Sequence, residues 1–348
     1  MIRRFPNFFH EFQCLAGSCP RSCCIGWEVE IDDGTAAAYQ SLTNPLGAEL
    51  RACLQTDAEG ALCFPLDGAR CPFLDSENLC RIHRQLGQEY TSVTCREHPR
   101  FTEDFGTLQE ISLSASCPEA ARLLLADDAP LTFLDEPLPA APHTEEEDPW
   151  LSPLLAVRNH SMTLLNRRTQ PVRRRMAQVL VLAAQAQTLL DEDRAEDLPA
   201  LCCGVPEIPP APQDAPILFP GFLNKLAGLE ILEADWLPLL KTTGKQGIRL
   251  PDEQLERLTA YFLFRWLLKS INDGDLLGRV QLSLASALTV EYLSARTASP
   301  EEALYRYCRE IEHCQENIDA LLDAFQWDAS LLPDTFLRTL ENTPLPSV

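Results

Sequence analysis

The sequence contains no long hydrophobic run. No stretch approaches the ~18 consecutive apolar residues that indicate a membrane-spanning helix. Near the N-terminus, Arg3 and Arg4 are followed by Pro6 and polar residues rather than by the ~7–15 apolar residues of a signal peptide. We therefore expect a protein of the bacterial-type cytoplasm that has no membrane partner.

Several cofactor and nucleophile motifs are also missing. No Gly-x-Gly pair occurs anywhere, and there is no P-loop and no Gly-x-Ser-x-Gly elbow. These absences argue against a Rossmann-type cofactor domain, a phosphate-binding loop and an α/β-hydrolase site. Positive charge is scarce, since 29 lysines and arginines stand against 51 acidic residues and the net charge is −22. Such a surface repels phosphate backbones, so we expect no nucleic-acid partner and favour basic or lysine-bearing partners.

Cysteine, in contrast, is abundant and concentrated in one part of the chain. Ten of the 14 cysteines fall between residues 14 and 117. Disulfides rarely persist in a reducing cytoplasm, so a dense group of cysteines there indicates metal ligands. Eight of them form the set that we predict to bind metal: Cys14, Cys19, Cys23, Cys24, Cys71, Cys80, Cys95 and Cys117.

The number of these cysteines leaves two arrangements open. Thiolates suit zinc or iron–sulfur clusters, and one tetrahedral zinc or one cubane cluster takes four protein ligands. Eight thiols exceed that need, so either two metal sites exist or some of the thiols are structural. The other cysteines, such as Cys53, Cys63 and Cys308, are expected to be small buried hydrophobic residues.

The chain divides by composition into a cysteine-rich part and a helical part. We predict a mostly α protein, in which a small irregular α+β cysteine-rich domain (1–126) precedes a Pro-rich acidic linker (127–152) and a helical domain (153–348). The helical domain is interrupted by a Pro-rich break at 191–220. Apolar spacing predicts helices over 35–54 (broken at Pro45), 153–168, 172–190, 222–241, 251–271, 275–296 and 300–325.

Local signals place three of the predicted features. Alternating residues at 27–32 predict a short strand, and the apolar runs on either side of Asp75–Asn78 predict a hairpin that brings Cys71 near Cys80. Ser299 precedes a proline and a glutamate at the spacing of a capping box, which predicts a helix start.

The cysteine blocks, taken in order, resemble a known family. The pattern C-x4-C-x3-C-C followed by Gly26–Trp27, then CPFL, LCRIH and TCREHPR, is similar to the flagellin lysine N-methylases. These belong to a wider group with a CxxCxxCC-type iron- or zinc-chelating domain. The resemblance covers residues 14–117, and the eight cysteines match the eight of that domain in order. It implies methyl transfer from S-adenosylmethionine to flagellin lysines, with a [4Fe-4S] cluster and these cysteines as its metal-binding set.

Lysine methylation sets chemical demands that suggest further residues. The amine must be neutral to attack the sulfonium methyl group, although its free pKa is ~10.4. Aromatic faces and acids would favour the sulfonium, and Trp27 lies beside the first cysteine block. Arg96 and Arg100 are candidates to pair with the donor's carboxylate. His83 and His98 are further candidates, although each of these residues also has a purely structural interpretation.

Two functions of other classes stay open at this point. The chain could be a non-enzymatic zinc-binding interaction or chaperone-like module for a flagellar or other export substrate. It could also be a redox sensor that uses the adjacent pair Cys23 and Cys24. The identity of the metal and the binding of S-adenosylmethionine distinguish these functions from a methyltransferase.

Overall fold

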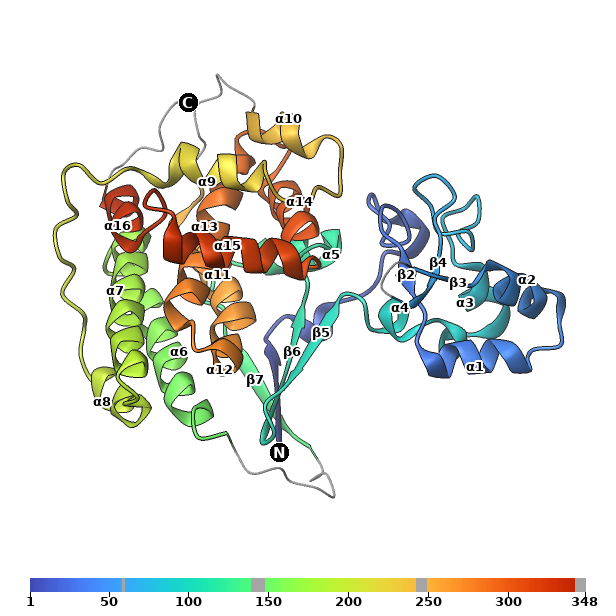
Figure 1. Ribbon diagram of the computed structural model, residues 1–348, viewed down its shortest axis with the longest axis horizontal. Helices are drawn as coiled ribbons and strands as arrows, with labels where there is room; N and C mark the ends of the chain where they lie inside the picture. Colours follow the sequence, from blue (N-terminus) through green and yellow to red (C-terminus); the bar gives the residue numbers. More distant parts are fainter. Residues whose placement is uncertain (58–59, 139–147, 242–248, 342–348) are drawn as a thin grey trace.

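The computed structural model describes residues 1–57, 60–138, 148–241 and 249–341. It has two hydrophobic cores, which belong to two bodies that lie side by side (Figure 1). We call residues 14–98 the cysteine lobe and the remaining described residues the helical body. Helices dominate and the strands are few, so the predicted mostly α class is confirmed. None of the helices in the described ranges has the length and apolarity to cross a bilayer.

The cysteine lobe is a small α+β unit. Its sheet has the order β2-β4-β3, formed by Val29–Glu30, Leu62–Phe64 and Gln55–Thr56. Helices α1 (Asp33–Ser41), α2 (Pro45–Cys53), α3 (Arg81–Leu86) and α4 (Val93–Glu97) surround it. The predicted break at Pro45 is confirmed, because Asn44 caps α2 by accepting a hydrogen bond from Gly47 N at 2.7 Å.

A second sheet belongs to the helical body. Its order is β5-β6-β1-β7, formed by Arg100–Asp104, Leu108–Leu113, Ile2–Pro6 and Phe133–Pro137. Strand β1 runs parallel to β6 and antiparallel to β7. The segment predicted as a linker therefore contributes an edge strand, β7, while its residues 139–147 lie outside the described ranges.

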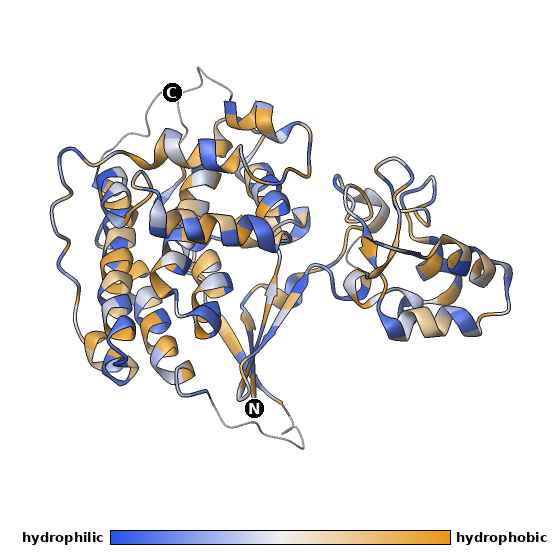
Figure 2. Cartoon of the chain, in the orientation of Figure 1, coloured by the Kyte–Doolittle hydropathy of each residue, from blue (hydrophilic) through white to orange (hydrophobic). Residues whose placement is uncertain are grey.

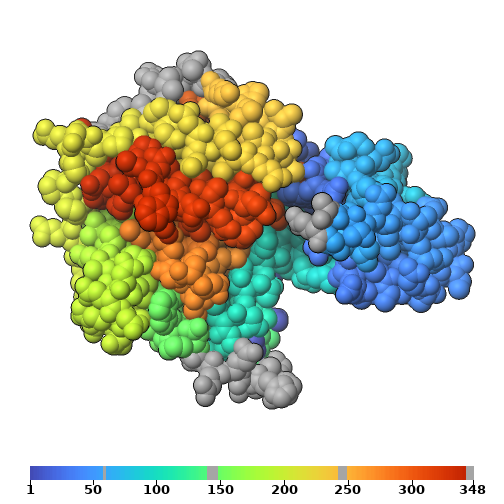
Figure 3. All heavy atoms as spheres, viewed as in Figure 1, coloured from blue at the N-terminus to red at the C-terminus, as the bar shows by residue number. Residues whose placement is uncertain are grey.

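The two cores do not follow the predicted division at residue 126. Leu113 and Leu124 lie in the large core with the helices, whereas the core of the cysteine lobe contains residues such as Phe64 and Phe73. The reason is that β6 pairs with both β1 and β5, which joins these strands in one sheet. In addition, α5 (Pro118–Leu125) buries its apolar face against the helices. Figure 3 shows the cysteine lobe projecting from the larger body.

The helical body is built around α13, whose residues are almost all buried. Contacts join it to α7, α11, α14 and α15. Its helices mix hydrophobic and hydrophilic residues along their length, as Figure 2 shows. Their bounds are α6 Leu151–Leu165, α7 Val172–Asp191, α8 Leu198–Leu201, α9 Leu218–Leu226, α10 Trp236–Lys241, α11 Asp252–Trp266, α12 Ser270–Asp273, α13 Leu276–Ser294, α14 Pro300–Ile311, α15 Gln315–Trp327 and α16 Pro333–Glu341.

The structure differs from the predicted helices in several places, which include three short helices that were not predicted, α3, α4 and α8. The predicted helix 222–241 is two helices, α9 and α10, and the predicted helix 300–325 is divided into α14 and α15. Helix α16 was not predicted. The division lies at residues 312–314, where the backbone of Cys314 is extended and the side chains of Glu312 and His313 hydrogen-bond with the segment before α5.

The predicted start of α14 is confirmed in detail. Ser299 Oγ accepts a hydrogen bond from Glu302 N at 3.2 Å, and Glu302 Oε2 accepts one from Ala298 N at 2.9 Å. We expect Ser299→Ala to lower the free energy of unfolding by about 1 kcal/mol, because an orphan backbone donor loses its partner. Urea unfolding followed by circular dichroism would measure this change, and an unchanged midpoint would contradict it.

Candidate functional site

Four of the eight predicted cysteines gather in the cysteine lobe through backbone contacts. The carbonyl of Cys24 accepts a hydrogen bond from Cys71 N at 2.9 Å. Leu74 pairs with Cys80 across the turn that the sequence predicted as a hairpin, and Cys80 is the N-cap of α3. Cys95 lies in the first turn of α4, where its N–H is bound by Ser92 Oγ at 3.2 Å.

The thiols of these four residues lie close enough together to affect one another's pKa. Burial, together with the neighbouring thiols of Cys24, Cys95 and Cys80, raises the pKa of Cys71 to about 12. Burial likewise raises the pKa of Cys95 to about 11, with added contributions from Cys24 and Cys80. Burial and then Cys24 also raise the pKa of Cys80. We therefore group Cys24, Cys71, Cys80 and Cys95 as the first thiol group.

Cys24 differs from the others in this group because its anion is stabilised. A hydrogen bond from the Cys23 thiol lowers its pKa to about 7 against the effect of burial, and Ser22 and Arg70 contribute in the same direction. The same hydrogen bond raises the pKa of Cys23 far above its usual value. The lobe thus holds one thiol that ionises near neutral pH, as a soft metal ligand must.

The remaining predicted cysteines form a second thiol group at the edge of the lobe. Burial raises the pKa of Cys117 to about 11, and Cys19 and Cys14 add to this. Burial raises the pKa of Cys19, and Cys14 and Cys24 add to this. The pKa of Cys23 is raised chiefly by its hydrogen bond with Cys24 and by burial, with a smaller contribution from Cys14, so Cys23 links the two groups. Cys117 precedes α5 and packs against the core of the helical body. The second thiol group, Cys14, Cys19, Cys23 and Cys117, therefore includes residues from both bodies.

The donor set fits a soft metal by its chemistry. Buried thiols that raise one another's pKa are stabilised as anions when a cation lies among them. Within the described ranges, however, no three or more His, Cys, Asp or Glu side chains converge closely enough to hold an ion as they stand. Each cysteine has a single side-chain torsion, χ1, with which to turn its sulfur toward a common centre. The ligand set therefore stays a prediction.

The three residues predicted to bind the cofactor lie in different settings. Trp27 donates from Nε1 to the carbonyl of Cys23 at 2.7 Å and faces the helical body. The Arg96 guanidinium donates to the carbonyl of Thr91 at 2.5 Å, within its own loop. The Arg100 guanidinium lies over the rings of two phenylalanines in the N-terminal segment. Trp27 is therefore the one of the three that lies beside both the thiols and the second body.

A further group of side chains lies where the two bodies meet. In Figure 1, α5 and α14 lie on the side of the helical body that faces the cysteine lobe. The group draws on these regions, on β5 and α11, and on two residues of the lobe. We call it the junction cluster, and it comprises Trp27, His98, Phe101, Ser114, Ser116, Tyr261, Arg265, Arg309, Glu312 and His313.

His313 is the centre of the aromatic part of the junction cluster. Its ring centroid lies 4.9 Å from that of Trp27, 5.0 Å from Phe101 and 6.0 Å from His98. The Arg309 guanidinium lies 4.1 Å from the Trp27 ring centroid, and that guanidinium also donates to the carbonyl of Ile25 at 3.0 Å. Aromatic rings from both bodies therefore surround His313, and the Arg309 guanidinium lies against one of these rings, that of Trp27.

The polar part of the cluster lies behind this ring. His313 Nε2 is 2.9 Å from Ser116 Oγ and 3.2 Å from Ser114 Oγ. Ser114 donates to Glu312 at 2.5 Å, and the Tyr261 hydroxyl donates to the other oxygen of that carboxylate at 2.6 Å. Glu312 is buried, so these bonds satisfy a carboxylate that would otherwise be costly.

Both histidines of the cluster are held in the neutral form. Desolvation, with smaller contributions from His98, Arg265 and Arg309, lowers the pKa of His313 to about 3. Desolvation and then Arg309 lower the pKa of His98 to about 4. His313 is nevertheless exposed to solvent. Protein therefore surrounds the His313 ring on most sides, which accounts for its desolvation, while solvent still reaches part of the side chain.

The sequence analysis did not identify most of this cluster. His98 was a candidate because it lies in the TCREHPR block, but His313 fell inside a predicted helix. Ser114, Ser116 and Glu312 carry no motif, and they come together only through the packing of α14 against α5. The one available signal is the pair Glu312–His313 at a point where α14 ends.

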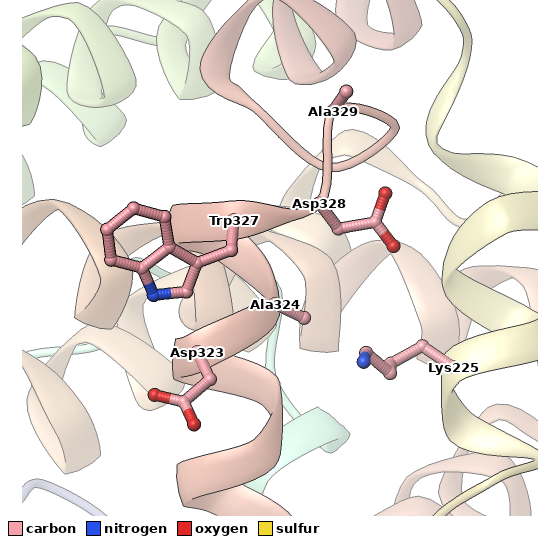
Figure 4. Close-up of a pocket in the computed structure, with 6 residues that line it drawn as sticks. All are labelled: Lys225, Asp323, Ala324, Trp327, Asp328 and Ala329. Carbon is pink, nitrogen blue, oxygen red and sulfur yellow. The ribbon is translucent and has the colours of Figure 1, made fainter.

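A surface pocket of about 490 Å³ lies elsewhere, at the C-terminal end of α15. Figure 4 shows Lys225, Asp323, Trp327 and Asp328 among its lining residues. The Trp327 side chain is 82% exposed, which is unusual for so large an apolar group. The pocket contains none of the predicted site residues, so we do not place the chemistry there.

Comparison with known proteins adds a relationship to this geometry. The chain is 30% identical to the flagellar biosynthetic protein FliU of Salmonella muenchen over 131 residues, which cover 76% of that protein and 35% of this chain. The chain belongs to the FliU family. It is also 29% identical to the lysine-N-methylases of Salmonella typhimurium and Salmonella choleraesuis over 128 residues.

The relationship to the methylases covers part of each protein. The match spans 32% of each lysine-N-methylase and 35% of this chain. No family model and no solved structure matches the chain. Membership of the FliU family thus agrees with the resemblance seen in the cysteine blocks, at the level of a distant, methylase-related group.

Proposed function

We propose that the protein is a protein-lysine N-methyltransferase that transfers methyl groups from S-adenosylmethionine to flagellin or another lysine-bearing protein. The observation that carries this proposal is the similarity to FliU and to the two lysine-N-methylases. The charge of the chain supports it, since 51 acidic residues against 29 basic ones favour approach of a lysine-rich surface.

The proposal includes a [4Fe-4S] cluster held by the first thiol group. Cys24, Cys71, Cys80 and Cys95 supply the four thiolates that one cubane takes, and the anion of Cys24 is already favoured near neutral pH. When bound, the cluster would tie together the four segments of the lobe that carry these residues. The second thiol group, Cys14, Cys19, Cys23 and Cys117, is then a separate metal site, for which zinc is the alternative to iron.

The residues that would bind the substrates lie next to these thiols. The Trp27 ring is held by its hydrogen bond to the carbonyl of Cys23 and carries the Arg309 guanidinium 4.1 Å from its centroid, so the candidate surface for the cationic sulfonium is the part of the ring that Arg309 does not cover. Arg96 and Arg100 stay candidates for the carboxylate of the methyl donor. The helical body, which packs against Trp27 through Arg309, would complete the binding site for the protein substrate.

The test is methyl transfer by protein that has been purified without oxygen. We expect brown protein with about four irons and four sulfides per chain, and incorporation of labelled methyl groups from S-adenosylmethionine into flagellin lysines. Flagellin whose lysines have been chemically acetylated is the matched control. Metal-loaded protein that transfers no methyl group to flagellin or to a lysine-rich protein mixture would overturn the proposal. Colourless protein with stoichiometric zinc that binds a flagellar substrate without modifying it would favour the interaction module.

A further inference from the structure

We propose that the junction cluster holds the substrate's lysine side chain as a neutral amine, and that His313 Nδ1 accepts a hydrogen bond from it. The assignment rests on the methyltransferase function proposed above and adds the place where the methyl acceptor binds. None of the residues that carry it, apart from Trp27 and His98, was a candidate on the basis of sequence.

The hydrogen-bond chain behind His313 determines which ring nitrogen is available. The Glu312 carboxylate faces Arg265 and can only accept, so the single proton of Ser114 Oγ is donated to it at 2.5 Å. Ser114 Oγ and Ser116 Oγ lie 2.8 Å apart, and because the one proton of Ser114 is used on Glu312, we infer that Ser116 is the donor in this pair. It accepts in turn from His313 Nε2 at 2.9 Å. Nδ1 therefore keeps the lone pair, and it has no hydrogen-bond partner among the residues that the structure describes.

Two guanidinium groups near this ring disfavour an ammonium group. The Arg309 guanidinium lies 4.1 Å from the Trp27 ring centroid, and the Arg265 guanidinium lies 4.0 Å from that of Phe101. Desolvation and these cations lower the pKa of His313, and they act in the same direction on an amine beside it. The cluster thus supplies what the reaction needs, an amine without its proton.

The other titratable groups that face His313 do not reverse this effect. His98 is neutral, because desolvation and Arg309 lower its pKa to about 4. The negative charge of Glu312 is compensated by Arg265, whose Nε lies 3.8 Å away, and by the hydroxyl groups bound to it. The carboxylate of Glu233 is bound to Arg309 Nε at 2.9 Å, and Arg309 still lowers the pKa of His313.

The transfer step balances with the sulfonium methyl donor as the only co-reactant. The lone pair of the amine nitrogen forms the new N–C bond. The S–C bond breaks and its electron pair stays on sulfur, which leaves a neutral thioether. The methylated nitrogen is left positively charged and loses its proton to solvent. In this step, the hydrogen bond to His313 Nδ1 orients the amine so that its lone pair is free for the methyl group.

The first test replaces the acceptor nitrogen. We expect His313→Ala to lower kcat for methylation roughly 100-fold, the effect of losing the group that orients a reacting atom, with little change in KM. His313→Gln keeps a carbonyl oxygen as acceptor and should lose less. His160→Gln is the matched control, because His160 lies in α6, outside the junction cluster, and its Nε2 is 2.6 Å from the carbonyl oxygen of Gly204. Metal content and thermal unfolding are measured for each variant to exclude a folding effect.

The second test measures how the positive charge of Arg309 affects the pH dependence of kcat. For the wild type, kcat should rise with pH through an inflection below the ~10.4 of free lysine. Arg309→Met should move that inflection upward, whereas Arg309→Lys, which keeps the charge, should not. If the wild type is active, two results would overturn this assignment alone. One is a kcat of His313→Ala equal to that of the wild type, and the other is a pH inflection of Arg309→Met equal to that of the wild type. A wild type that transfers no methyl group would instead overturn the function on which the assignment rests.

Discussion

Replacing Glu256 by alanine should lower the free energy of unfolding by about 3–5 kcal/mol, the usual effect of removing one partner of a buried ion pair. Glu256 in α11 binds Arg175 of α7 and also Arg168, whose Nη2 lies 2.7 Å from Oε1. The Glu256 and Arg175 side chains are 1% and 2% exposed. The variant would leave the Arg175 guanidinium buried without its carboxylate, and water cannot replace that partner.

The prediction is checked by urea unfolding of the two variants Glu256→Ala and Glu192→Ala. Glu192 is the matched control, because it forms an ion pair with Arg194 but its side chain is 51% exposed. We expect that substitution to cost less than about 1 kcal/mol. If Glu256→Ala cost as little, Arg175 would have to find another carboxylate, and Asp252 is the nearest, with Oδ2 3.9 Å from Nη2.

Much of the fold could be predicted because its signals are local. Pro45 ends one helix and begins another, and Ser299 begins α14 through a capping box, since both effects depend on neighbouring residues only. The segment of β7 was predicted to be part of a linker because it lies in a stretch rich in proline and acidic residues, and its strand forms by pairing with the distant β1. The division of the chain into two cores likewise depends on strand pairing between distant residues.

The candidate site shows the same limit. The eight cysteines were identified because their type and spacing are unusual, and the turn after Leu74 that brings Cys71 near Cys80 could be read from nearby residues. The junction cluster could not be identified in this way. Ser114 and Glu312 are 198 residues apart, and neither residue type is distinctive. Only the packing of α14 beside α5 and the cysteine lobe brings their side chains together.

Cys95→Ser should abolish loading of the proposed cluster and methylation together. Cys95 belongs to the first thiol group with Cys24, Cys71 and Cys80, and a serine hydroxyl is a poor soft ligand. Cys95 is not part of the hydrophobic core of the lobe, so the substitution leaves that core intact. We expect the visible absorbance to disappear and methyl transfer to fall by more than roughly 100-fold. That is the upper cost of losing a residue that only hydrogen-bonds to a metal ligand, and loss of a ligand itself should cost more. Iron and sulfide analysis and a methylation assay measure both effects.

Two further variants decide whether the thiols form separate groups. Cys53→Ser is the control, because the pKa of Cys53 is raised by burial alone and this residue belongs to neither group. Its metal content should equal that of the wild type. Cys117→Ser removes a thiol of the second group and should lower total metal while the absorbance of the first site persists. If all eight thiols belonged to one site, removing either Cys95 or Cys117 would lower the absorbance equally. Equal loss of absorbance in Cys95→Ser and Cys117→Ser would therefore contradict two separate sites. Methylation that persists in cluster-free Cys95→Ser would instead leave the cluster a purely structural part of the lobe.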